Sequence, residues 1–208
     1  MALSSGFPPN YKSLRFGPVQ SSNIELRDLT KAWLVISTAF TILMLGGATT
    51  DVSLVFFVFF STLLTAGAGF ISHELAHKFT AQSYGCFSEF RADNQMLTVA
   101  LLSSFLGFLF AAPGAVVTYN PVTRKENGLI SVSGPVANIV LAFFFLVLSY
   151  SPVTLFSGVA FFGFKINSWL ALFNLIPIGG LDGAKVWQWN KIVHVSLFFV
   201  ALIFSFMF

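Results

Sequence analysis

Long apolar stretches are the feature that most limits what this chain can fold into. Most of them approach the roughly 20 residues that a helix needs to cross about 30 Å of hydrocarbon. The six stretches cover residues 31–47, 52–77, 97–117, 134–151, 158–178 and 191 to the C-terminus. Only 9% of the 208 residues are charged, against about 25% in an average soluble domain. The sequence therefore predicts an integral membrane protein that is surrounded by the lipid bilayer.

No boundary divides the chain into domains. It has no long Ser/Pro-rich linker, no internal repeat and no polar stretch large enough to hold a soluble core. We therefore expect one domain over residues 1–208, with a polar cytoplasmic segment at 1–30 and a core at 52–186. The predicted fold class is an all-α polytopic bundle of about five to six transmembrane helices. Residues 1–30 show no cleavable signal pattern, so we expect the first span to be a retained anchor.

The basic residues indicate how the chain is oriented in the membrane. Four of them stand before the first span or open it, namely Lys12, Arg15, Arg27 and Lys31. Lys and Arg gather in cytoplasmic segments of membrane proteins, so the N-terminus is expected in the cytoplasm. The same rule explains the net charge of +3 without a nucleic-acid partner, and we expect none.

The stretch 97–117 can be read either as a full crossing or as a re-entrant segment. Its uninterrupted part, 97–112, is short for a crossing and is followed by Pro113 and Gly114. The re-entrant interpretation puts ten of the eleven basic residues on one side and leaves only Lys165 in a span, where it could snorkel to the interface. Irregular backbone is permitted at that depth when protein or a water-lined cavity shields it. We prefer the re-entrant interpretation.

The motif HELAH at residues 73–77 ends the second apolar stretch. Residues four apart share a helix face, so His73 and His77 can present two imidazoles to one ion. Glu74 points about 100° away around the axis, where it can hold a water molecule on that ion. This is the HExxH pattern of zinc metalloproteases, in which zinc lowers the pKa of a water toward about 7 and the glutamate accepts its proton. A chance match is the alternative, but polar groups are penalised in a span, which favours a metal.

A catalytic zinc needs a third protein ligand. The candidates are Asp28, Asp51, Asp93, Asp182, Glu25, Glu89, Glu126 and His194. Asp182 follows the apolar run NLIPIGG, where Pro177 and Gly179 should interrupt the helix and let the backbone bend into a cavity. The local alternative for Asp182 is a turn or cap residue. For His194, the favoured interpretation is a histidine at an interfacial helix end.

Topology adds an independent constraint on the third ligand. His77 and Asp182 can share one ion only if an even number of crossings separates them, because both must lie at a similar depth. With 97–117 re-entrant, the crossings between them are 134–151 and 158–178. The charge pattern and the metal site therefore select the same topology.

Three motifs follow one another in the chain: HELAH at 73–77, SGPVAN at 133–138 and NLIPIGGLDG at 174–183. In this order they resemble the site-2 protease family of intramembrane zinc metalloproteases. The resemblance implies that His73, His77 and Asp182 bind one zinc ion and that Glu74 is the general base. It also implies that Asn174 holds the substrate or the developing oxyanion, since an amide aimed at new negative charge is a strong stabiliser. For Asn138 we favour a hydrogen bond between helices.

The family also places sheet-forming segments between its two zinc-bearing spans, and one edge there can pair with an unwinding substrate. In this chain the place is taken by residues 85–130, and PGAVVTY at 113–119 is the best strand candidate. The expected function is hydrolysis of peptide bonds within or near transmembrane segments of membrane protein substrates, with the active site toward the cytoplasmic side. The alternatives are a divalent-metal transporter, which would carry acids and histidines along several spans, and a catalytically inactive membrane scaffold.

Overall fold

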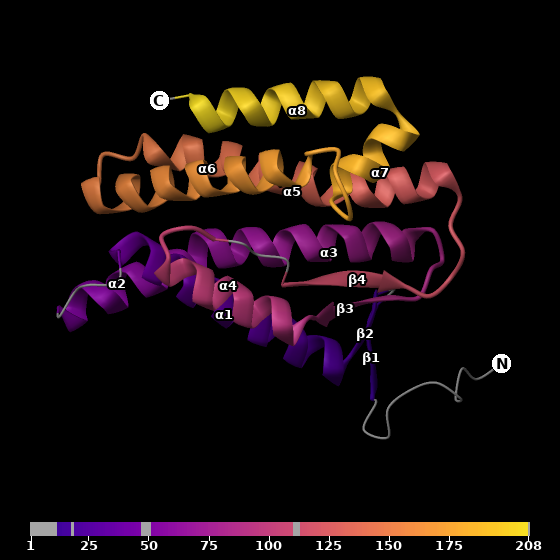
Figure 1. Ribbon diagram of the computed structural model, residues 1–208, viewed down its shortest axis with the longest axis horizontal. Coiled ribbons are helices and arrows are strands. Elements are labelled where there is room, and N and C mark those ends of the chain that lie inside the picture. The colour runs from indigo at the N-terminus through magenta and orange to yellow at the C-terminus, as the bar shows by residue number, and fades with distance from the viewer. Residues whose placement is uncertain (1–11, 18, 47–50, 110–112, 208) are drawn as a thin grey trace.

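The computed structural model describes residues 12–17, 19–46, 51–109 and 113–207. Helices make up most of it, with two small antiparallel sheets of two strands each, β1–β2 and β3–β4 (Figure 1). The elements are β1 Ser13–Phe16, β2 Val19–Ser22, α1 Asn23–Leu45, α2 Val52–Thr62, the π-helical turn η1 Leu63–Gly67, α3 Ala68–Ser83, β3 Ser88–Ala92, α4 Asn94–Phe105, β4 Gly114–Thr118, α5 Arg124–Ser149, α6 Thr154–Asn174, α7 Asp182–Trp189 and α8 Lys191–Phe206.

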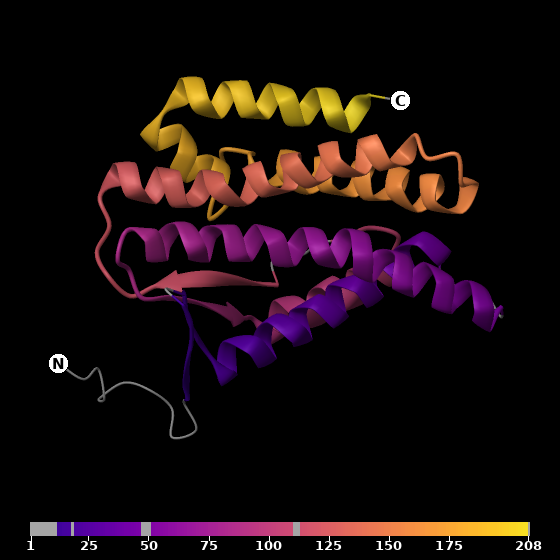
Figure 2. The same cartoon turned by 180° about the vertical axis from the view of Figure 1, so that it is seen from behind.

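The helices are stacked in layers that run in similar directions. In Figures 1 and 2, α3 lies between a layer of α5 and α6 on one side and a layer of α1, α4 and the β3–β4 sheet on the other. Helix α8 covers the outer side of α5 and α6. The strands and α7 lie toward one end of the molecule, and the turn between α5 and α6 lies at the other end.

Four helices of the described residues are long and apolar enough to cross a membrane. They are α1, the continuous helix formed by α2, η1 and α3, and the pair α5 and α6, with lengths of 23, 32, 26 and 21 residues. Helix α8 is apolar but has 16 residues, about 24 Å at 1.5 Å per residue. The predominantly helical fold is therefore confirmed and agrees with a membrane protein, and the described residues contain four helices of spanning length where five to six were expected.

The stretch 97–117 forms a short helix followed by a strand. Helix α4 begins after Asp93, whose side chain accepts the backbone N–H groups of Gln95 and Met96, and it ends at Phe105. Its 12 residues reach about 18 Å, well short of the hydrocarbon thickness. Residues 110–112 lie outside the described part of the chain. The strand expected at 113–119 is confirmed as β4, and the short helix supports the re-entrant interpretation.

Local signals explain where the other helices begin and end. Helix α1 begins at Asn23, well before the apolar stretch, because the Ser22 side chain caps it by accepting the Glu25 N–H at 3.2 Å. Helix α6 ends at Asn174, before the interruption expected from Pro177. Gly179 then takes a φ of +60°, a conformation that favours glycine. The chain can therefore turn sharply between α6 and α7.

Apolar side chains pack between α3 and the β3–β4 sheet. Buried side chains from α1, α3, β3 and α4 meet there: Leu29, Ala32, Phe70, Phe90 and Leu97. The Phe70 and Phe90 rings contact edge to face with centroids 5.6 Å apart. Strand β3 pairs antiparallel with β4, with Phe90 opposite Val116. This packing holds β4 against the helix that carries HELAH.

Candidate metal centre

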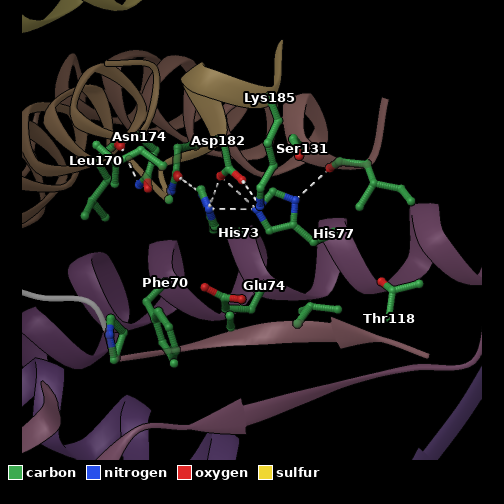
Figure 3. A pocket seen from close by; sticks show the side chains of 18 of the residues that line it. Phe70, His73, Glu74, His77, Thr118, Ser131, Leu170, Asn174, Asp182 and Lys185 are labelled. Carbon is green, nitrogen blue, oxygen red and sulfur yellow. Dashed lines mark hydrogen bonds and ion pairs between the residues drawn. The ribbon is translucent and has the colours of Figure 1, made fainter. Parts of the chain in front are cut away.

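Two histidines and one aspartate from distant parts of the chain meet between α3, α5 and α7 (Figure 3). The Nε2 atoms of His73 and His77 lie 3.0 Å apart. The Oδ2 atom of Asp182 lies 3.2 Å from His73 Nε2 and 3.0 Å from His77 Nε2. All three side chains are buried. The structure thus brings together the three residues that the sequence suggested as metal ligands.

The opposite ring nitrogens of both histidines face oxygen acceptors. His73 Nδ1 lies 2.7 Å from Asn138 Oδ1, and His77 Nδ1 lies 2.7 Å from the carbonyl oxygen of Ile130. A carbonyl can only accept, so each Nδ1 carries the proton and donates. In a neutral imidazole the other nitrogen then has a free lone pair. Both Nε2 atoms are therefore left as metal-binding atoms.

With both imidazoles neutral, the site gathers three acceptor atoms around one point. Two lone pairs and a carboxylate oxygen, all within 3.0–3.2 Å of one another, repel unless positive charge, from a metal ion or from a proton on an imidazole, lies among them. Two imidazoles and one carboxylate form one of the ligand sets of catalytic zinc, which keeps its fourth position open. The residues present therefore fit zinc, and backbone and side-chain partners hold the ligand rings in the orientation that zinc needs.

Asp182 is ionised in these surroundings. Burial by itself raises the pKa of the carboxyl group, but His77 and His73 beside it outweigh burial and hold the pKa below the usual range. Lys185, one helical turn further along α7, lies 3.9 Å from Asp182 Oδ1. The Asp182 carboxylate can therefore act as a negatively charged oxygen ligand for a cation.

Close packing of α5 against α3 depends on Gly134. A Cβ atom at this position would stand 2.5 Å from His77 Nε2 and 2.7 Å from His73 Cε1. No side chain larger than hydrogen fits there without displacing an imidazole. The glycine of the SGPVAN motif is thus explained by its contact with the two histidines.

Glu74 and Asn174 line the same cavity as the three candidate ligands. The cavity has a volume of about 440 Å³, and β4 forms part of its wall through Gly114, Ala115, Val116 and Thr118. In Figure 3, Glu74 lies between the imidazoles and β4. The Asn174 amide donates one N–H to the Leu170 carbonyl oxygen at 2.9 Å, which leaves a second N–H. A peptide bound along β4 would have these polar groups within one enclosed space.

His194 lies apart from this group. Its side chain is buried on α8, and its Nε2 lies 2.7 Å from the carbonyl oxygen of Leu175, the residue directly after α6. It stacks on Phe198 and meets the Trp187 ring edge on. His194 therefore holds the start of the loop that leads to Asp182. Among the described residues, the acids other than Asp182 do not join the cluster.

Several residues around the site were not singled out for this role by sequence reasoning. Asn138 does bond between helices, as expected, since its amide donates to Gly69 O at 3.0 Å and to Asn167 Oδ1 at 3.1 Å. Its contact with His73 was not expected. Lys185, which lines the cavity, was not expected either. The only sequence signal for Asn138 and Asn167 is that each places an amide inside an apolar helix, where polar groups need partners.

Known proteins resemble this chain over much of its length. It is 44% identical over 140 residues to "Putative zinc metalloprotease MJ0611" of Methanocaldococcus jannaschii, a match that covers 65% of this chain and 73% of that protein. It is 35% identical over 129 residues to "Putative zinc metalloprotease Rip2" of Mycobacterium tuberculosis, which covers 53% of this chain and 49% of Rip2. It is 31% identical over 144 residues to "Putative zinc metalloprotease YwhC" of Bacillus subtilis, covering 60% and 66%.

The chain matches no model of a known protein family, and no solved structure matches it. It spans about half the length of Rip2. The match to the Methanocaldococcus jannaschii protein covers nearly three-quarters of that relative at 44% identity. On this similarity, and with the HELAH histidines and Asp182 gathered at one point, the chain belongs to the site-2 protease family of zinc metalloproteases.

Proposed function

We propose that this protein is an intramembrane zinc metalloprotease that cleaves peptide bonds within or near transmembrane segments of other membrane proteins. One observation carries the proposal. His73 Nε2, His77 Nε2 and Asp182 Oδ2 lie within 3.0–3.2 Å of one another at the wall of a cavity that Glu74 also lines. This group lies among helices long and apolar enough to span a membrane. The names of the relatives support the protease chemistry.

His73, His77 and Asp182 would hold the zinc ion. When bound, zinc would act as a Lewis acid on the scissile carbonyl and would make water acidic enough to lose a proton near neutral pH. Glu74 accepts that proton and later passes it to the leaving amine. The free N–H of Asn174 stabilises the negative charge that develops on the carbonyl oxygen. These roles use side chains that line one cavity.

The substrate is a transmembrane helix that unwinds locally. Peptide bonds inside a helix are hydrogen-bonded and crowded, so cleavage requires an extended segment. Strand β4 is hydrogen-bonded to β3 along one edge and lines the cavity. An unwound substrate strand pairing with its other edge would have its backbone held in an extended form beside Glu74.

The position of the site in the membrane follows from the charge pattern. The strands and α7 lie toward one end of the molecule in Figure 1, and this end carries Lys125 and Lys185. The rule that basic residues face the cytoplasm supports a cytoplasmic position for this end and for the active site. A single metal group among the described residues supports a fixed site over a transport path.

Replacing Glu74 with Gln tests the proposal. The variant keeps the shape of the side chain and the three metal ligands but loses the base. We expect it to bind zinc as the wild type does and to cleave a model transmembrane peptide at no detectable rate. Glu126→Gln is the matched control, because Glu126 caps the start of α5 through Thr123 and should leave cleavage intact. Cleavage by the Glu74 variant at the wild-type rate would reject the assigned base. Uptake of divalent metal into proteoliposomes without any peptide hydrolysis would favour a transporter.

A further inference from the structure

Two fully buried asparagines connect α6 to His73 across α5. Asn138 on α5 places its Oδ1 2.7 Å from His73 Nδ1, and its Nδ2 donates to Gly69 O at 3.0 Å and to Asn167 Oδ1 at 3.1 Å. Asn167 on α6 donates its Nδ2 to Gly163 O at 2.9 Å and to Thr65 O at 3.4 Å. Both side chains have no exposed surface. Every amide group in this chain of contacts is thus used.

Backbone carbonyls fix the direction in which both amides point. The end of Asn167 that faces Gly163 O and Thr65 O must be its NH₂ group, because a carbonyl oxygen cannot donate. Its oxygen therefore faces Asn138. The same reasoning at Gly69 O turns the NH₂ group of Asn138 away from His73 and its oxygen toward His73. The orientation of the Asn167 amide thus fixes the orientation of the Asn138 amide.

The helix that carries HELAH is shaped to admit this contact. Thr65 belongs to the π-helical turn η1, which interrupts the long helix directly before α3. Gly69 follows one turn later, and a Cβ atom there would collide with the Asn167 side-chain oxygen. The backbone around Thr65 and Gly69 thus leaves room for the amide of Asn167 and supplies two of the acceptors that orient the pair.

We propose that Asn167 is a positioning residue for the metal centre and acts on His73 through Asn138. The inference rests on the proposed function, in which His73 is a zinc ligand. The alternative tautomer of His73 carries its proton on Nε2, where it would donate to Asp182 Oδ2, 3.2 Å away. That tautomer has no lone pair for zinc. Asn138 held with its oxygen toward Nδ1 excludes it, and Asn167 keeps Asn138 from rotating.

Zinc affinity measured by chelator competition on the purified full-length protein tests the inference without any activity readout. Asn138→Leu should weaken zinc binding by about 10- to 100-fold, and Asn167→Leu by about 10-fold. Losses of about this size are usual when a hydrogen-bond partner of a metal-bound histidine is removed. The double variant should bind zinc no more weakly than Asn138→Leu alone, because Asn167 acts only through Asn138. Ser168→Ala is the matched control: Ser168 is also fully buried on α6, but its hydroxyl bonds to Phe164 O in its own helix. It should bind zinc as the wild type does.

Wild-type zinc affinity in Asn167→Leu would overturn the inference. So would losses of zinc affinity from the two substitutions that multiply in the double variant. A second measurement needs no substitution. Side-chain ¹⁵N spectra of the wild-type protein, with zinc removed by the chelator, should show His73 protonated on Nδ1, and protonation on Nε2 would overturn the inference. A wild-type protein that binds no zinc would instead reject the proposed metal site. The tautomer of His73 would then still decide whether Asn167 and Asn138 orient this histidine.

Discussion

Replacing Lys78 with Met should lower the free energy of unfolding by about 3–5 kcal/mol, the usual cost of leaving one partner of a buried ion pair alone. Lys78 follows the last histidine of HELAH and is 2% exposed. Its ammonium group contacts the Glu25 carboxylate, which has no exposed surface. The pair is thus buried from water on both sides, and the full desolvation cost of the remaining charge applies.

Glu25 joins three elements through its two oxygens. Besides Lys78 on α3, it accepts the Phe90 N–H of β3 at 2.9 Å and the Ser21 hydroxyl at 2.6 Å, just before α1. Glu25→Gln alone should cost several kcal/mol as well, since the Lys78 ammonium then stays buried without a counter-charge. In Glu25→Gln/Lys78→Met no charge is buried, and the amide oxygen can still accept the Phe90 N–H. The double variant should lose only about 1–2 kcal/mol, the scale of one or two neutral hydrogen bonds.

Equilibrium unfolding in mixed micelles of a mild detergent and sodium dodecyl sulfate measures these differences. Arg27→Met is the control, because the Arg27 side chain is 77% exposed and lies 3.7 Å from Asp28, so its loss should change stability by less than about 1 kcal/mol. Single variants within 1 kcal/mol of the wild type, or a double variant whose loss equals the sum of the single losses, would refute the reasoning.

Two further predictions concern the metal ligands. Gly134→Ala should lower bound zinc well below that of the wild type, because the added methyl group would stand 2.5 Å from His77 Nε2; full zinc content, measured by elemental analysis of the purified protein, would show that α5 can move away. Asp182→Asn should weaken zinc binding at neutral pH, because the lowered pKa of Asp182 keeps the carboxylate ionised there and the variant replaces this negative ligand with a neutral amide. Wild-type zinc affinity of the variant at neutral pH, measured by chelator competition, would contradict this.

The sequence predicted those parts of the site that local patterns encode. The four-residue spacing of His73 and His77 fixes a shared helix face, and Pro177 with the glycines after it predicts the end of α6. The turn signal followed by β-branched residues predicts β4. No local rule relates Asp182 to HELAH. Counting the membrane crossings between them made Asp182 a candidate for the third ligand.

The remaining features depend on partners that no local pattern reveals. The Glu25–Lys78 pair joins residues 53 positions apart, and Asn138 finds His73 across 65 positions. Two polar residues in apolar helices predict that each will need a partner, but packing decides which one. The π-helical turn η1 could not be predicted either, because the sequence LLTAG is typical of an ordinary helix. Helix α1 begins earlier than its apolar stretch since a cap, not hydropathy, sets its start.

The coordination shell of zinc in the purified wild-type protein tests the central claim most directly. X-ray absorption at the zinc edge should show one zinc ion per chain with two imidazole nitrogens at about 2.0–2.1 Å and oxygen ligands at a similar distance. Loss of one imidazole from that shell in His73→Ala, and of an oxygen ligand in Asp182→Ala, would agree with convergence of these side chains on one ion. A shell with sulfur, or one unchanged by either substitution, would contradict it.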